Sequence, residues 1–200
     1  MNKLILTDCD GVILNWFPTF LERMSLEKNM PYTNTINSYH HVERCFGITK
    51  EQVYDLIKEF NTSDHMKTLP PLPKAISGMT KLHDELGYTF GLISSFSFHE
   101  NSHADRDENL HKHLHPDMFA FKNYLHDNSS KVEALTPYKD SGTIWVEDHI
   151  GHANDGQALG LTSVLIAHDY TSEDRKHLHE EVIIVDSWEE IYHMVANNQL

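Results

Sequence analysis

The chain has 200 residues, of which 30 are acidic and 16 basic, and its formal net charge is −14. So large a negative charge opposes binding to a phosphate backbone, so a nucleic-acid-binding protein is disfavoured. The chain has only two cysteines, which argues against a disulfide framework. It has no apolar run of about 18 residues, as a membrane span would need, and a strand-like segment directly after Met1 argues against an export signal. We therefore expect a cytoplasmic protein.

The first predicted element is a buried strand over Leu4–Thr7, which ends on two carboxylates, Asp8 and Asp10. Residues two apart in an extended chain point the same way, so both carboxylates should face one crevice. Gly11 then permits a turn. Two like charges so close need a cation or a shared proton, and Mg²⁺ is the natural cation for carboxylate oxygens.

Helical patterns occupy the stretch that follows. One helix is predicted over Trp16–Lys28, and a second begins at Thr49 with Gln52 at the capping-box position. A proline-rich segment over 70–73 then returns the chain to the sheet. We therefore predict a core domain over residues 1–15 and 73–200, with residues 16–72 inserted as a small helical cap.

Several aromatic residues of this cap have two interpretations. They could line a pocket for a nucleobase, or they could form the core of the cap, which aromatic residues at helical spacing more often do. These residues are Trp16, Phe17, Phe20, Tyr39 and Phe46.

Strand-length apolar runs alternate with helical patterns through the rest of the chain. The strands are predicted at Tyr88–Ser94, Thr143–Val146, Thr162–Ile166 and Val182–Val185, with a minor edge strand at Phe119–Phe121. The helices are predicted at Ala75–Leu86, at His152–Leu159 and from Ser187 onward, where Glu190 completes a capping box. This alternation predicts an α/β fold, a Rossmann-like, doubly wound parallel sheet.

A histidine-rich segment lies between the second and third strands and comprises His99, His103, His111, His113 and His115. It is either a metal-binding tract or a polar helix face exposed to solvent. The second interpretation is favoured because period-two spacing scatters side chains around a helix, and the acidic or cysteine partners of a zinc site are missing.

Polar side chains follow the predicted strands where each one ends. Ser94-Ser95 could bind a phosphoryl oxygen, and Glu147-Asp148 could hold a metal ion. Lys131 stands at a predicted helix start, which favours an anion. Because ligands bind beyond the carboxyl ends of parallel strands, these groups together indicate phosphoryl transfer, with one aspartate as nucleophile and the other as its acid–base partner.

Four segments in this order resemble the motifs of the haloacid dehalogenase superfamily: LILTDCDGV, FGLIS, SSKVEAL and IWVEDHIGHANDGQALGL. The resemblance spans residues 4–166. It implies a Mg²⁺-dependent phosphomonoester hydrolase with Asp8, Asp10, Ser94 and Lys131 as catalytic residues and Asp8, Asp10 and Asp148 as metal ligands. His152 stands where the family often has a further acidic or amide residue, which leaves the secondary metal ligand open. Cys9 is expected to point into the sheet packing.

The opening DCDGVILNWFPTF is also similar to the 5'(3')-deoxyribonucleotidase-like branch. The superfamily implies a small phosphate ester as substrate, and this further similarity implies a nucleoside monophosphate, with Arg106 and Asn109 as part of the substrate wall. Ser95 is expected to bind the substrate through its phosphoryl group. Two alternatives remain, a 2-haloacid dehalogenase and a non-catalytic binding protein of the same fold. The sequence leaves the oligomeric state open.

Overall fold

The computed structural model describes residues 3–32, 41–96, 101–126 and 129–200. Its centre is a six-stranded sheet in the order β3-β2-β1-β4-β5-β6, in which every neighbouring pair is parallel. The strands are β1 (Leu4–Thr7), β2 (Thr89–Phe96), β3 (Phe119–His126), β4 (Ile144–Glu147), β5 (Thr162–Ile166) and β6 (Ile183–Val185). The predicted doubly wound parallel sheet is confirmed.

The strand order reverses at β1, so β1 stands at the switch point where such sheets bind their ligands. In the register, Thr7 lies opposite Leu92 of β2 and Val146 of β4. Asp8 therefore leaves the sheet between the ends of two neighbouring strands. β3 is an edge strand as predicted, but it has eight residues, because it pairs along β2 as far as Phe96.

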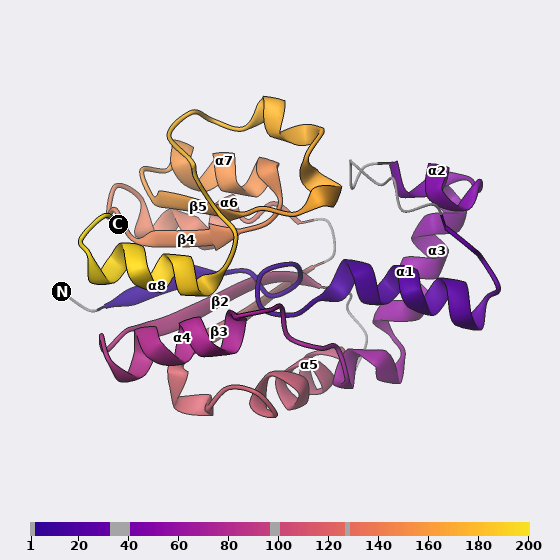
Figure 1. The fold of residues 1–200 in the computed structure, drawn as a ribbon, viewed down its shortest axis with the longest axis horizontal. Coiled ribbons are helices and arrows are strands. Elements are labelled where there is room, and N and C mark those ends of the chain that lie inside the picture. The colour runs from indigo at the N-terminus through magenta and orange to yellow at the C-terminus, as the bar shows by residue number, and fades with distance from the viewer. Residues whose placement is uncertain (1–2, 33–40, 97–100, 127–128) are drawn as a thin grey trace.

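Helices cover both faces of the sheet (Figure 1). On one face lie α4 (Ala75–Asp84), α5 (Ser102–His111) and α8 (Trp188–Ala196), and on the other α6 (Val132–Leu135) and α7 (Ile150–Ala158). Ser187 precedes α8 as predicted, but the predicted capping box is wrong. The Ser187 hydroxyl accepts no hydrogen bond from the helix, and the Glu190 carboxylate instead accepts one from the backbone N–H of Asp186 (2.9 Å).

Three helices follow β1 and lie beyond the carboxyl end of the sheet, at the right of Figure 1: α1 (Trp16–Glu27), α2 (Val42–Phe46) and α3 (Lys50–Asn61). The capping box at Thr49 and Gln52 is confirmed, since each side chain accepts a hydrogen bond from the other's backbone N–H. The Phe60 ring contacts those of Trp16 and Phe20 edge to face. This packing is continuous with the core on the α4–α8 face of the sheet, and the cap boundaries at residues 16 and 72 stay a prediction.

Three of the described histidines of the histidine-rich segment, His103, His111 and His115, have separate partners. His103 stacks on Tyr124, and the His111 ring lies 2.9 Å from the Lys122 ammonium. The His115 ring accepts a hydrogen bond from a backbone N–H. Within the described residues, three potential metal ligands come together at a different place, on Asp8 and the end of β4. His99 lies outside these residues.

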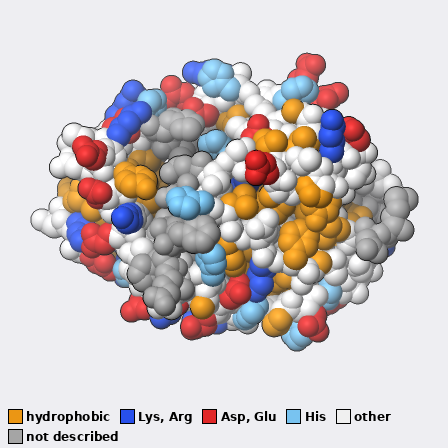
Figure 2. Space-filling model, turned by 180° about the vertical axis from the view of Figure 1, so that it is seen from behind, with side chains coloured by type: hydrophobic (Ala, Val, Ile, Leu, Met, Phe, Trp, Pro, Cys, Tyr) orange, Lys and Arg blue, Asp and Glu red, His pale blue; other side chains and the backbone are white. Residues whose placement is uncertain are grey.

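The surface seen in Figure 2 mixes acidic and basic side chains, and its apolar side chains gather mainly in one area. The negative charge on this face is therefore spread out. Among the described helices, none combines the length and the apolar character that a bilayer crossing requires.

Candidate active site

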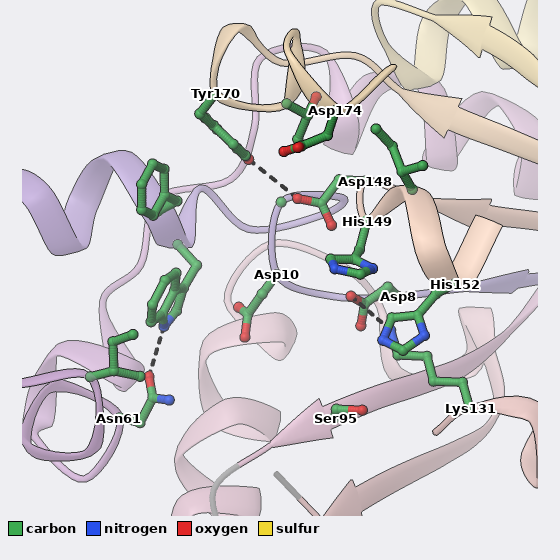
Figure 3. Close-up of a pocket in the computed structure, with 16 residues that line it drawn as sticks. Asp8, Asp10, Asn61, Ser95, Lys131, Asp148, His149, His152, Tyr170 and Asp174 are labelled. Carbon is green, nitrogen blue, oxygen red and sulfur yellow. Dashed lines mark hydrogen bonds and ion pairs between the residues drawn. The ribbon is translucent and has the colours of Figure 1, made fainter. Parts of the chain in front are cut away.

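A cavity of about 390 Å³ opens at the carboxyl end of the sheet (Figure 3). Its polar wall carries Asp8, Asp10, Lys131 and Asp148, which come from three separate segments of the chain. Its apolar wall comes largely from α1 and α3. The cavity therefore joins the strand ends to the helices that follow β1.

Asp8 is 7% exposed and has its backbone fixed by a hydrogen bond from its N–H to the Val146 carbonyl (3.0 Å). Burial raises the pKa of this carboxyl group, while the nearby Lys131 ammonium and a hydrogen bond from Ser94 act in the opposite direction. Its Oδ2 lies 3.0 Å from the Lys131 Nζ. A nearly dry carboxylate beside one cation can act as a nucleophile.

Lys131 lies directly before α6 and is 1% exposed. Its ammonium group forms ion pairs with both Asp8 and Glu147 and lies 5.4 Å from the centre of the Trp145 ring. Burial by itself would lower the pKa of Lys131, but the two carboxylates raise it above its ordinary value. The lysine is therefore a fixed positive charge at the floor of the cavity.

Glu147 is fully buried at the end of β4, and both of its oxygens are occupied. Oε1 binds the Lys131 ammonium, and Oε2 accepts hydrogen bonds from the backbone N–H groups of Asp148 and His149 (both 2.9 Å). Although burial would raise the pKa of Glu147, Lys131 and then His152 lower it overall. Glu147 thus orients the lysine and the turn that carries Asp148.

Asp148 has the opposite electrostatic environment. Burial, followed by repulsion from Glu147 and Asp8, raises its pKa well above the ordinary value. Its Oδ2 accepts a hydrogen bond from the Tyr170 hydroxyl (3.3 Å), drawn as a dashed line in Figure 3. A carboxylate in this position is stabilised by a cation.

A divalent metal ion fits these residues. Carboxylate oxygens of Asp8, Glu147 and Asp148 lie within 4.8 Å of one another. Gly11 leaves the space open, since a Cβ there would come within 2.0 Å of Asp148 Oδ2. The donors are hard oxygen ligands, which suit Mg²⁺. Because Glu147 already uses both oxygens, Asp8 and Asp148 are the better ligands, and the predicted contribution of Asp10 stays a prediction.

Asp10 faces the cavity, but its carboxylate is held from behind by Arg106. The guanidinium donates to both oxygens, with NH2 2.9 Å from Oδ2, and Arg106 is itself 1% exposed. Asn109, one turn further along α5, is fully buried and donates to the carbonyls of Met66 and Leu69 (both 3.1 Å). Neither Arg106 nor Asn109 lines the cavity, so these contacts do not support the predicted substrate-binding roles.

The two serines at the end of β2 differ in position. Ser94 is 2% exposed and hydrogen-bonds toward Asp8, whereas Ser95 lines the cavity. The Ser95 hydroxyl donates to the Ser129 carbonyl (3.3 Å).

Cys9 is fully buried, and burial raises the pKa of its thiol to about 12, in keeping with a packing role.

The comparisons with known proteins agree with this architecture. No family model matches the chain. It is 26% identical over 168 residues to an uncharacterised 32.4 kDa protein of enterobacteria phage T4, covering 78% of this chain but only 58% of that relative. Similar solved structures include a haloacid dehalogenase-like hydrolase from Streptococcus pneumoniae (TM-score 0.67, 14% identity, 97% of this chain and 98% of that one). The chain has the haloacid dehalogenase fold.

Two further structures show the range of proteins that share this fold. One is a D,D-heptose 1,7-bisphosphate phosphatase from B. bronchiseptica with magnesium and phosphate (TM-score 0.62, 13% identity, 98% of this chain and 99% of that one). The other is an L-2-haloacid dehalogenase from Xanthobacter autotrophicus (TM-score 0.56, 11% identity, 98% and 99%). The fold expected from the four motifs is confirmed.

Some residues that line the cavity in this haloacid dehalogenase fold have little or no signal in the sequence. Tyr170 follows the end of β5, a position that the rule for parallel strands could have indicated. Asn61 lies at the end of α3, where its Oδ1 accepts a hydrogen bond from the Trp16 indole (2.8 Å). The spacing of the motifs gives no signal for Asn61, because only packing of α3 on α1 brings it to the cavity.

Proposed function

We propose that this protein is a Mg²⁺-dependent phosphomonoester hydrolase that forms an aspartyl-phosphate on Asp8. The observation that carries the proposal is the position of the Asp8 carboxylate. It is nearly dry, paired with the Lys131 ammonium, and faces the same cavity as Asp10 and Asp148. Phosphoryl transfer depends mainly on positioning and charge stabilisation, and these residues supply both.

In the first step, an Asp8 oxygen attacks phosphorus while the bond from phosphorus to the ester oxygen breaks. Asp10 donates a proton to the departing alkoxide. In the second step, Asp10 takes a proton from a water molecule, which attacks phosphorus and releases inorganic phosphate. Asp8 is thereby regenerated, and Asp10 is again protonated for the next turnover.

Other residues of the chain hold the phosphoryl group and its charge. The Lys131 ammonium remains beside Asp8 throughout. The Ser95 hydroxyl, which lines the cavity, can turn from the Ser129 carbonyl to donate to a phosphoryl oxygen, while the Ser94 hydroxyl holds Asp8 by its hydrogen bond. Mg²⁺, when held by Asp8 and Asp148, would neutralise negative charge on the phosphoryl group.

For the substrate we propose a nucleoside monophosphate, since the cavity has an apolar wall opposite its carboxylates. Trp16, Phe17 and Ile57 contribute to this wall, which suits a planar ring. Asn61 lies across the cavity from Asp8 in Figure 3. Because the Trp16 indole occupies its Oδ1, the amide is oriented with its NH₂ group available as a donor to a nucleobase.

The test is a turnover assay of the purified protein with Mg²⁺ on deoxynucleoside monophosphates, sugar phosphates and p-nitrophenyl phosphate. We expect phosphate release that EDTA abolishes and that is fastest with a nucleotide. Asp8→Asn should reduce turnover roughly a thousandfold or more, because it removes the nucleophile while keeping its shape. A wild-type protein inactive on the whole panel, or an Asp8→Asn variant with wild-type turnover, would contradict the proposal.

Further measurements separate the two alternatives. Chloride release from a 2-haloacid without added metal would favour a dehalogenase. Mg²⁺ binding without turnover of any ester, together with a stable protein complex, would favour a non-catalytic binding protein. The carboxylate of Asp10 in the cavity favours the phosphatase, because an alkoxide leaving group needs a proton and a halide does not.

A further inference from the structure

A buried arginine stands behind the proposed acid–base residue. The Arg106 guanidinium donates to both carboxylate oxygens of Asp10, and its two terminal nitrogens also lie 3.4 Å from the Cys9 sulfur and 3.5 Å from the Met66 sulfur. The Arg106 side chain is 1% exposed, whereas that of Asp10 is 24% exposed. A ligand in the cavity therefore meets the carboxylate and not the guanidinium.

A bidentate pair fixes the plane of the carboxylate as well as its position. Each carboxylate oxygen has two lone-pair positions, so the two bonds from Arg106 leave one on each oxygen for a proton or a substrate. An ion pair with one buried partner is, in addition, a poor source of stability, because the charge on that partner loses its hydration and apolar residues of similar volume often serve as well. The geometry thus favours a role in holding Asp10 ready for proton transfer.

The helix that carries Arg106 is itself anchored. Asn109 donates to the Met66 and Leu69 carbonyls, and the Lys112 ammonium donates to the Lys67 carbonyl (2.9 Å). These bonds join α5 to the last part of the predicted cap. Arg106 therefore projects from a helix that is held by fixed contacts to residues 66–69.

We propose that Arg106 is a positioning residue for Asp10, which holds the carboxylate where it can protonate the leaving group. This inference rests on the proposed phosphatase activity. It replaces the predicted direct contact between Arg106 and substrate with an action through Asp10.

Substrates that differ in their need for a proton test this role. An alkyl phosphate needs protonation of its leaving oxygen, whereas nitrophenolate departs from p-nitrophenyl phosphate without it. In Arg106→Met, kcat/KM for the alkyl ester should fall roughly tenfold to a hundredfold, and that for p-nitrophenyl phosphate by less than about threefold. Because kcat/KM covers only the steps up to formation of the phosphoenzyme, the comparison isolates the protonation of the leaving group.

Two further variants complete the test. Arg106→Lys keeps the charge but loses the two-pronged contact, so its ratio of alkyl to aryl activity should lie between those of wild type and Arg106→Met. Arg106→Lys also allows the positioning role to be tested if Arg106→Met does not fold. In the Asp10→Asn background, adding Arg106→Met should cause no further loss of alkyl activity, since Arg106 acts through Asp10.

Leu110→Val, a mild change at a fully buried position of the same helix, is the matched control and should lower the melting temperature without changing the ratio. Equal losses on both esters, or an unchanged ratio in both Arg106 variants, would overturn the positioning role while leaving the phosphatase intact. A wild-type protein inactive on both esters would instead overturn the proposed function, and the positioning role with it.

Discussion

The central residue-scale feature is one buried ammonium shared by two carboxylates. Lys131 lies between Asp8 and Glu147, both of which are buried, and Asp148 is next to Glu147 in the chain. A site with several carboxylates and one fixed cation is balanced only while that cation is present. Lys131 therefore stabilises the buried carboxylates and, in the proposed mechanism, also the phosphoryl group.

Lys131→Met should impair stability and activity together. Its removal leaves buried carboxylates uncompensated, so we expect a loss of roughly 3–5 kcal/mol in the free energy of unfolding, measured by urea denaturation. Turnover of the surviving folded protein should fall about a hundredfold or more, because a stabilising charge is missing. Lys139→Met, at an exposed lysine, is the control and should change neither quantity appreciably. A stable and active Lys131→Met variant would contradict this account of the site.

At the scale of elements, the turn after β1 decides whether the site can form. Gly11 has φ +73°, and its carbonyl accepts a hydrogen bond from the His168 Nε2 (2.6 Å), which must therefore carry the proton. The side chain of Asp148 occupies the space where a Cβ at residue 11 would stand. The turn thus brings the ends of β1, β4 and β5 together.

Gly11→Ala tests this close approach. Its positive φ should cost about 1 kcal/mol of stability, and the new methyl group should also displace Asp148 and weaken Mg²⁺ activation at least tenfold. Gly47→Ala is a matched control, since Gly47 has φ +66° but a methyl group added there would meet nothing within 4 Å. It should lose only the stability, about 1 kcal/mol, that the positive φ costs, and should have a normal Mg²⁺ titration. Identical Mg²⁺ titrations for the two variants would contradict the argument.

Most of the helices and strands could be predicted from the sequence because the patterns that indicate them are local. The capping box at Thr49 and the apolar runs of β1, β4 and β5 depend on neighbouring residues alone. β3 was underestimated because its side chains alternate only weakly in burial, and its length comes from pairing with β2. The capping box before α8 failed because Glu190 accepts its hydrogen bond one residue earlier than expected.

At the scale of the whole molecule, the carboxyl groups at the proposed metal site make the stability of the fold depend on pH. The chain carries a net charge of −14, and the carboxyl groups of Asp8 and Asp148 have raised pKa values in the folded protein. The fold therefore binds more protons at these two groups than the unfolded chain does. Their contribution to stability is present at low pH and is lost as the pH rises through the raised pKa values.

Asp148→Asn should therefore stabilise the metal-free protein. In EDTA we expect its melting temperature to exceed that of wild type by an amount that grows as the pH is raised from the ordinary carboxyl range to neutrality. Mg²⁺ should stabilise the wild type, by about 2.7 kcal/mol at a hundredfold excess over Kd, and should have little effect on Asp148→Asn. Differential scanning calorimetry at several pH values measures both effects. Equal Mg²⁺ responses in the two proteins would show that Asp148 does not hold the metal.

The parallel α/β fold could be predicted from the sequence, as could the strand ends that carry carboxylates and hydroxyls and the helix start that carries lysine, because alternating apolar runs and their polar ends are local patterns. The sequence could not determine which of these groups pair. Only the tertiary structure placed Arg106 behind Asp10, Glu147 against Lys131, and Asn61 beside Trp16. Those contacts join residues far apart in the chain, and they depend on how helices dock on the sheet, which no local pattern specifies.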